Sequence, residues 1–250
     1  MGGSPPKGGS PSMLLIGRYN PKHHYMPTPE KLKAPFLPGA FYHLVCKSVD
    51  GILLFYQEKD HEVYLERFKK FLGDFVSTWS YSLLSNHTHY ICKIKSVESI
   101  TVFLEILPEK EKTKSMLQWE RQKSNLDLFD EMLERQMNRF LVSYANYLNN
   151  KYERRGSVFQ SPFKRLQING EEYLQQAVIY VHANVQKHGV ISDYKEHFHS
   201  SFNNIMKDDS YYADVNNVLD FFKGKEQFLK IHEEQVAYFY SRGWPSSKLE

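Results

Sequence analysis

The sequence predicts a mixed α+β domain built on an antiparallel sheet and followed by a helical C-terminal extension. Segments typical of strands and helices occur in the first half of the chain in the order strand, helix, strand, strand. The second half contains longer segments with the periodicity of amphipathic helices. The chain has 250 residues, of which 41% are hydrophobic and 24% charged, as is typical of a globular protein that buries a core.

Three strands and one helix are expected in the first half. Residues 41–48 are dense in β-forming side chains and are followed by an Asp50-Gly51 turn signal. Residues 79–84 and 88–94 have the same character and are joined by a short Ser85-Asn86 break. In residues 61–76, apolar side chains recur at three- and four-residue steps, which predicts an amphipathic helix; these are Tyr64, Leu65, Phe68, Leu72 and Phe75.

The second half predicts helices separated by one irregular segment. The clearest helix covers residues 126–148, and residues 151–165 after it are irregular and basic, with Gly156 and Pro162 as breakers. Another helix is expected over residues 171–188. Its start is indicated by Asn169 with Glu172 three residues later, and its end by Gly189. Two further helical patterns follow, one on Val215, Val218, Leu219 and Phe222 and the other on Phe228 and Ile231.

These patterns divide the chain into three parts. Residues 1–38 form a leader and a Pro-rich arm, residues 39–203 the central domain, and residues 204–250 the helical extension. The first twelve residues consist mainly of Gly, Ser and Pro and lack the apolar run of a secretory signal, so we interpret them as an expression leader or a disordered tail.

The composition restricts the classes of protein to consider. No stretch approaches the roughly 18 consecutive apolar residues that a membrane span needs, so we expect no membrane partner. Cys46 and Cys92 lie in apolar segments, which favours buried free thiols in a reducing compartment over a disulfide. A net charge of +3 and a pI near 8.6 do not by themselves identify an acidic partner.

His87 and His89 are the first candidate functional residues. Side chains two residues apart on a strand project from the same face, so the two imidazoles can chelate one metal ion. Two histidines on a half-exposed strand without a ligand role are the alternative. The pattern alone leaves both interpretations open.

Tyr180 and Asn184 are the second candidate pair. They stand one helical turn apart, so the phenol and the amide can point at one spot and reach the same metal-bound phosphate. The alternative is an ordinary tyrosine at the edge of the core beside a solvated asparagine.

The irregular segment 151–165 is the third candidate. It carries five Lys or Arg residues and one Glu, a local charge of +4, with aromatic residues in between. Cations that contact phosphates and rings that stack on bases are what sequence-tolerant binding of a single strand requires, although a solvated loop with buried aromatic anchors has the same composition. The candidate DNA contacts are Lys151, Arg154, Arg155, Phe159, Gln160, Lys164 and Arg165.

Four segments, taken in order, carry a resemblance to one family. The run from Tyr81 to His89 resembles a strand that ends in Met-Pro-Asn-His-Val-His, and residues 149–160 resemble Asn, then Tyr, then Arg-x-Gly-x-Leu-Phe-Gln. Residues 179–189 resemble Tyr-Ile-His-x-Asn-Pro-Val-x-His-Gly, and residues 199–202 resemble a trailing Ser-Ser-Phe. These signatures are those of the REP-associated and related single-tyrosine HUH transposases. The likeness covers about residues 41–202, with Thr88, Leu84-Ser85 and Val185 as departures from the pattern.

The resemblance implies a fold, an activity and roles for the candidate residues. His87 and His89 would be the paired metal ligands, Asn184 the third ligand, and Tyr180 the nucleophile that forms a 5′-phosphotyrosine with DNA. Mg²⁺ or Mn²⁺ would be the metal, and single-stranded or hairpin DNA the substrate of a DNA transposition reaction. The resemblance also implies a ferredoxin-like antiparallel sheet with helices on one face, a homodimer, and a bacterial cytoplasmic, nucleoid-associated location.

Three alternatives remain open at this point. A domesticated relative of the same fold would bind nucleic-acid hairpins without transposing them. A non-enzymatic RNA-binding module would need exposed aromatic side chains on adjacent strands, such as Tyr42 and Tyr90. A nuclease or phosphatase that uses water would leave no protein–DNA adduct.

Overall fold

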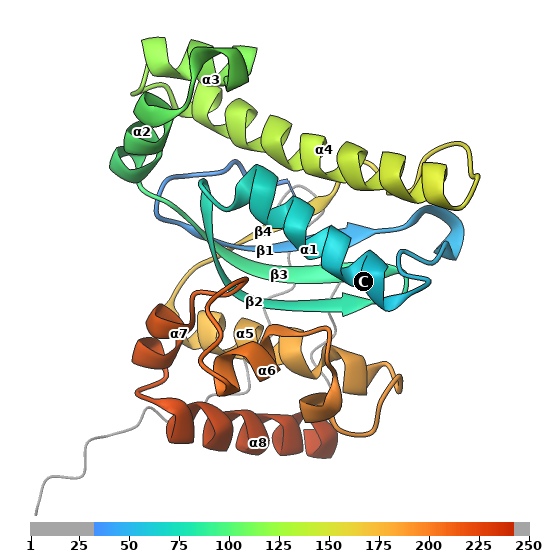
Figure 1. Ribbon diagram of the computed structural model, residues 1–250. Helices are drawn as coiled ribbons and strands as arrows, with labels where there is room; N and C mark the ends of the chain where they lie inside the picture. The colour runs from blue at the N-terminus through green and yellow to red at the C-terminus, as the bar shows by residue number, and fades with distance from the viewer. Residues whose placement is uncertain (1–32, 243–250) are drawn as a thin grey trace, which may run out of the picture.

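Four strands form one antiparallel sheet at the centre of the molecule (Figure 1). They are β1 (Phe41–Lys47), β2 (Val76–Leu84), β3 (His87–Ile94) and β4 (Lys164–Ile168), and their order across the sheet is β2-β3-β1-β4. The computed structural model describes residues 33–242, so most of the expected leader and arm, residues 1–38, lies outside the described residues. The strand order and pairing confirm the expected α+β class with a ferredoxin-like antiparallel sheet.

Strand β4 was not expected from the sequence. Its residues pair antiparallel with β1, from Phe41 opposite Ile168 to Val45 opposite Lys164, and bury Leu166 and Ile168. The strand has only five residues, of which two are basic, and it follows Pro162 closely. A segment so short and polar gains its strand conformation from pairing with β1, which local sequence patterns do not report.

Two long helices connect the strands and cover one face of the sheet (Figure 1). They are α1 (Glu58–Leu72) and α4 (Leu126–Lys151), which pack against each other, with α2 (Val97–Ile106) and α3 (Lys114–Arg121) at the N-terminal end of α4. Their apolar stripes meet one set of alternating strand residues in a shared core, which includes Tyr42, Leu44, Tyr90 and Cys92.

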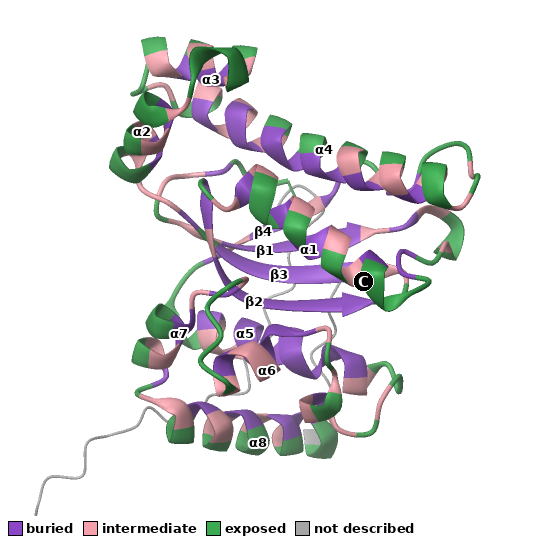
Figure 2. Cartoon of the chain, viewed as in Figure 1, coloured by how far each residue is buried: buried purple, intermediate pink, exposed green. Residues whose placement is uncertain are grey.

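The opposite face of the sheet is covered by α5 (Glu171–Lys187). The expectation of helices on one face therefore holds for α1 and α4 and is corrected for α5. A second core lies under α5 and contains Trp79 and Ile91 from the sheet and Val178 and Val181 from the helix. Because both faces are covered, almost every strand residue is buried (Figure 2).

The chain after α5 continues as three helices on the same side of the sheet (Figure 1). They are α6 (Ser201–Met206), α7 (Val215–Phe221) and α8 (Lys225–Arg242), so both helical patterns expected after residue 204 occur. α8 packs on α5, and its Phe228 and Val236 belong to the same core as Val178. The extension thus supports the helix that carries Tyr180.

Two smaller expectations concern the thiols and membranes. Cys46 and Cys92 are both buried and free, as expected. Within the described residues, none of the helices combines the length and apolarity that crossing a bilayer requires.

A candidate active site between strand β3 and helix α5

The paired histidines stand at the start of β3, directly after the Ser85-Asn86 turn. Leu84 and His87 pair across this turn, which fixes the register that turns His87 and His89 toward α5. Their ring centroids are 5.0 Å apart. His89 is fully buried, whereas His87 is half-buried at the end of the sheet. The structure thus brings the two imidazoles together on one face.

A third histidine, His43 on β1, supports His89 from the neighbouring strand. His43 Nε2 lies 2.9 Å from His89 Nδ1, and both side chains are buried. When Nδ1 of His89 donates this hydrogen bond, the lone pair of the ring is on Nε2. His43 was not among the candidate residues expected from the sequence, although it shares the alternating face of β1 with Phe41 and Val45 and is polar within an apolar strand.

His89 is held as a neutral imidazole. Burial lowers the pKa of His89 well below its usual value, and His43 and His87 lower it further. His89 Nε2 is buried and has no hydrogen-bond partner within residues 33–242. A neutral ring with a buried nitrogen is the form in which histidine binds a metal ion.

The second imidazole is also oriented by a neighbouring side chain. His87 Nδ1 lies 2.7 Å from Asn86 Oδ1, and an amide oxygen accepts hydrogen bonds only. Nδ1 of His87 is therefore the donor, and Nε2 carries the lone pair of the neutral ring. Such hydrogen bonds at the second nitrogen set the tautomer and the ring orientation of ligand histidines.

Helix α5 brings Tyr180, Asn184 and His188 onto one stripe, each one turn after the last. The ring centroid of Tyr180 lies 6.3 Å from that of His89 and 6.2 Å from that of His43. At the other end of the stripe, the ring of His188 lies 5.4 Å from that of His87. Asn184 stands between these two contacts, so its side chain faces β3.

Asn184 is fully buried, and neither its amide oxygen nor its amide nitrogen has a hydrogen-bond partner among the described residues. A buried amide without partners costs free energy, which an oxygen–metal bond would recover. His87, His89 and Asn184 offer two imidazole nitrogens and one amide oxygen, which are donors of the kind that a divalent cation accepts.

Lys187 adds a positive charge beside the phenol. Its Nζ lies 3.3 Å from the Tyr180 oxygen and 5.2 Å from the centre of the Tyr180 ring. An ammonium group at this distance stabilises negative charge on the phenolic oxygen. The phenol, the ammonium and the histidine rings thus meet on one side of α5.

The ends of α5 fix how far this stripe extends. The N-cap is Gly170, with φ +89 and no side-chain cap, so the expected capping signal from Asn169 and Glu172 is wrong. The helix ends at Lys187, one residue before the expected end, with His188 as its C-cap and Gly189 at φ +66.

The site opens to solvent at the end that carries His87 and His188. A pocket of about 220 Å³ is lined there by these two histidines together with Val45, Lys47, Leu84, Ser85, Asn86 and Val190. Tyr180 lies at the inner end of the site, where its side chain is only 6% exposed.

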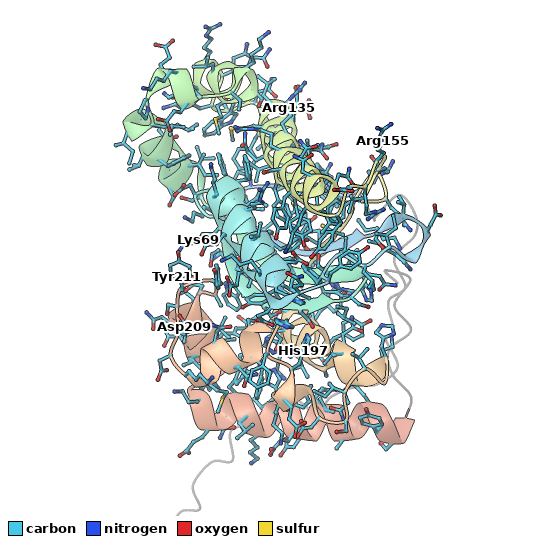
Figure 3. The ribbon with its side chains drawn as sticks, turned by 45° about the vertical axis from the view of Figure 1, so that its right-hand side comes forward. Lys69, Arg135, Arg155, His197, Asp209 and Tyr211 are labelled. Carbon is cyan, nitrogen blue, oxygen red and sulfur yellow. The ribbon has the colours of Figure 1, made fainter. Side chains whose placement is uncertain are left out.

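The basic segment passes close to this opening. Val158 O accepts a hydrogen bond from Val49 N, and Gln160 N donates to the backbone oxygen of Lys47, which lines the pocket. Phe159 is buried, whereas Arg155 is exposed at the tip of the loop (Figure 3). The structure therefore places the middle of the segment beside the pocket.

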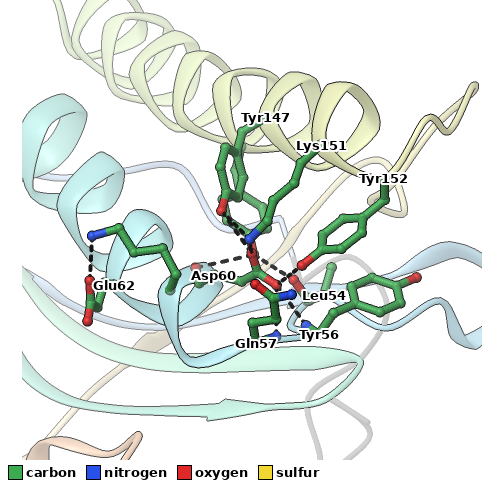
Figure 4. Close-up of polar contacts among 10 residues, drawn as sticks. Leu54, Tyr56, Gln57, Asp60, Glu62, Tyr147, Lys151 and Tyr152 are labelled. Carbon is green, nitrogen blue, oxygen red and sulfur yellow. Dashed lines mark hydrogen bonds and ion pairs between the residues drawn. The ribbon is translucent and has the colours of Figure 1, made fainter.

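Two of the candidate DNA contacts have carboxylate partners inside the fold. Arg165 is buried and bonds Asp130 and Glu134. Lys151 Nζ lies 2.6 Å from the buried carboxylate of Asp60, which also accepts hydrogen bonds from the phenols of Tyr147 and Tyr152 (Figure 4). The Lys151 contact holds the start of the basic segment against α1, and the Arg165 contacts hold its end against α4.

Comparison with known proteins gives a similarity to a solved structure. No family model matches the chain, and no curated protein matches it. The chain is similar to a solved structure described as a REP-associated tyrosine transposase bound to a REP hairpin, with a TM-score of 0.46 and 12% sequence identity. The similarity covers 73% of this chain and 90% of that chain. A likeness of this size assigns no function.

Proposed function

We propose that the protein is a metal-dependent endonuclease and strand transferase that acts on single-stranded DNA beside hairpins, with Tyr180 as the nucleophile. The observation that carries the proposal is the meeting of Tyr180 on α5 with His87 and His89 on β3, with Asn184 between them. Among the described residues, the buried amide of Asn184 has no hydrogen-bond partner, and the same is true of Nε2 of His89. Core packing alone does not account for these two buried polar groups.

His87, His89 and Asn184 would hold the metal, and Mg²⁺ or Mn²⁺ suits a site with an amide oxygen. When bound, the ion would polarise the scissile phosphate and orient it for in-line displacement. His43 would act as a positioning residue, because its hydrogen bond sets the tautomer and the orientation of His89.

Tyr180 would carry out the covalent step. Its phenolic oxygen attacks the phosphorus, a bond between the phenol and the 5′ phosphate forms, and the bond to the 3′ oxygen breaks. The phenolic proton passes to water, and the departing 3′ oxygen takes up a proton to leave as a free 3′-OH. Lys187 stabilises the developing phenolate, and reversal with another 3′-OH rejoins the strand without ATP.

The basic segment would bind the DNA backbone near the pocket. Arg154, Arg155 and Lys164 are the proposed phosphate contacts. Lys151 and Arg165 bond carboxylates of the fold. We place the catalytic unit in residues 39–203. The homodimer and the bacterial nucleoid-associated location remain predictions.

One alternative loses its main support. An RNA-binding module would present Tyr42 and Tyr90 to bases, but these side chains are 0% and 1% exposed and lie beneath the helices on the α1 face. A hairpin-binding protein without catalysis and a nuclease that uses water remain to be separated by experiment.

The proposal is tested by trapping the covalent intermediate. Incubation with labelled hairpin oligonucleotides and Mn²⁺ should give a denaturant-resistant adduct, and mass spectrometry should place the nucleotide on the peptide that contains Tyr180. Tyr180→Phe should abolish both cleavage and adduct and keep DNA binding near that of the parent, because only one hydroxyl is removed. Tyr173→Phe, two turns earlier on α5, is the matched control and should cleave normally.

The outcomes separate the alternatives. Cleavage without an adduct on any tyrosine favours the water-using nuclease. Binding without cleavage under all metal conditions favours the non-catalytic hairpin-binding protein. Full cleavage by Tyr180→Phe overturns the assignment of the nucleophile.

A further inference from the structure

A second cluster of metal-ligating side chains lies at the edge of the sheet. Glu58 and His61 stand about one turn apart at the start of α1, and His199 follows the short helix η4 (Tyr194–Glu196). One potential ligand atom from each side chain lies within 4.8 Å of the other two. His199 Nε2 is 3.3 Å from the Glu58 carboxylate. Three side chains from two distant parts of the chain thus converge on one point.

Backbone pairing with β2 brings His199 to this position. Leu83 N donates a hydrogen bond of 2.9 Å to His199 O, and Ser200 forms an isolated bridge with Ser82. The chain here extends the sheet beyond its edge strand and passes the first turn of α1. The placement of His199 is therefore fixed by the backbone.

His197 stands next to the cluster, two residues before His199. The chain turns at Phe198 and His199, and the rings of His197 and His199 are 5.7 Å apart. His197 Nε2 is buried and has no hydrogen-bond partner in the described residues, and the same holds for His61 Nδ1. Figure 3 shows His197 where the chain after α5 approaches the start of α1.

The rings of His61 and His199 stack face to face, with centroids 3.4 Å apart and planes within 3°. Two imidazolium cations would repel each other in this arrangement, so the geometry requires at least one neutral ring. Neutral imidazoles are the form that binds metal ions.

We propose that Glu58, His61 and His199 form a second metal site, which binds Zn²⁺. Imidazole nitrogens with one carboxylate oxygen are a zinc donor set. The Glu58 side chain is 71% exposed, so an ion can enter from solvent.

This site is separate from the candidate active site. His61 belongs to α1, which packs on the face of the sheet where Tyr64 bonds Thr88, whereas His87 and His89 face α5 on the other side. Zinc at the second site would join the start of α1 to the segment that leads from α5 into α6. Its role would be structural, as a connection between the helices on the two faces.

Zinc titration of the metal-free protein tests the proposal. The double variant His87→Ala/His89→Ala removes the first site, and calorimetry should then show one remaining equivalent of Zn²⁺. Co²⁺ in its place should give the visible absorption of a tetrahedral ion. Adding Glu58→Gln should weaken Zn²⁺ binding at least tenfold, and adding His199→Gln should abolish it.

Glu62→Gln provides the matched control, because this exposed carboxylate lies one turn later on α1 and outside the cluster. It should leave Zn²⁺ affinity unchanged and keep the rise in Tm on zinc addition that Glu58→Gln loses. The proposal is overturned by absence of zinc binding in the His87→Ala/His89→Ala variant, or by equal affinity in the Glu58→Gln and Glu62→Gln variants. No DNA cleavage is measured, so these outcomes are independent of the role of Tyr180.

Discussion

Replacing Asp60 by Asn is expected to destabilise the protein by about 3 kcal/mol at pH 7. The Asp60 carboxylate is fully buried and accepts five hydrogen bonds (Figure 4). Oδ1 accepts from the phenol of Tyr147 and the ammonium of Lys151, and Oδ2 accepts from the backbone of Tyr56 and Gln57 and from the phenol of Tyr152. All five groups donate, so the site is built for a carboxylate.

The magnitude follows from how an amide would fit this site. The amide has one oxygen, so its NH₂ group must face two or three donors. The less costly orientation turns NH₂ toward Tyr147 and Lys151, because a phenol can rotate to accept and Lys151, 27% exposed, can turn to water. Removing one partner of a buried ion pair costs about 3–5 kcal/mol, and the partial exposure of Lys151 places Asp60→Asn at the lower end.

The loss of stability in Asp60→Asn should also depend on pH. Burial alone raises the pKa of Asp60, but the hydrogen bonds from Lys151 and Tyr152 outweigh it and hold the pKa well below its usual value. A carboxyl whose folded-state pKa is lowered stabilises the protein fully above its unfolded pKa of about 3.9, and this stabilisation is lost as the pH falls toward the folded-state value. The difference in free energy of unfolding between the parent and Asp60→Asn should therefore be constant from pH 7 to pH 5. Below about pH 4 this difference should become smaller, by up to about 1.4 kcal/mol per pH unit.

Urea unfolding followed by circular dichroism measures this difference. Glu62→Gln changes a carboxylate to an amide in an exposed pair with Lys59 on the same helix, and should cost less than about 0.5 kcal/mol. An Asp60→Asn variant that is as stable as the control at pH 7, or whose deficit is unchanged at pH 3, would refute the argument.

Three further predictions concern the candidate active site. His43→Leu should lower Mn²⁺ affinity in calorimetry by about 10- to 100-fold, and His43→Gln should restore most of it, because only Gln keeps a polar atom near His89. Equal affinity in both variants would remove the positioning role. Lys187→Met should slow adduct formation on hairpin DNA by about tenfold or more without weakening DNA binding, since the ammonium acts on the phenolic oxygen; an unchanged rate would contradict this. Neutralising Arg154, Arg155 and Lys164 together should weaken hairpin binding. The slope of log binding constant against log salt concentration should become shallower by about 0.7 per lost phosphate contact, and an unchanged slope would indicate a solvated loop.

Much of the fold was predictable because its elements carry regular patterns. The apolar steps of residues 61–76 and 126–148 correspond to α1 and α4, and the hairpin around Ser85-Asn86 corresponds to β2 and β3. The face of the sheet on which α5 lies was not predictable from the sequence. The strands are buried on both faces, so their residues do not alternate between polar and apolar in a way that would mark a solvent-facing side. β4 depends on pairing across more than a hundred residues of sequence.

The candidate site was predictable only where its residues lie close in sequence. His87 with His89, and Tyr180 with Asn184, have the spacings of a strand and a helix, so their shared faces follow from the sequence. His43 and Lys187 gain their meaning only from contacts with His89 and Tyr180, which the fold creates. The spacing of His197 and His199 is the same as that of His87 and His89, and this repeated pattern was the signal available for the second cluster.

The contact between Tyr180 and His89 occurs within one chain, and this determines how the protein can be reconstituted. Each polypeptide carries all the groups of the proposed active site, so the specific activity should not depend on protein concentration. A mixture of two inactive chains, one with Tyr180→Phe and the other with His89→Ala, contains no intact set and cannot regain function by association. In a homodimer, the two subunits would then be able to hold two DNA ends at once, each linked to its own tyrosine.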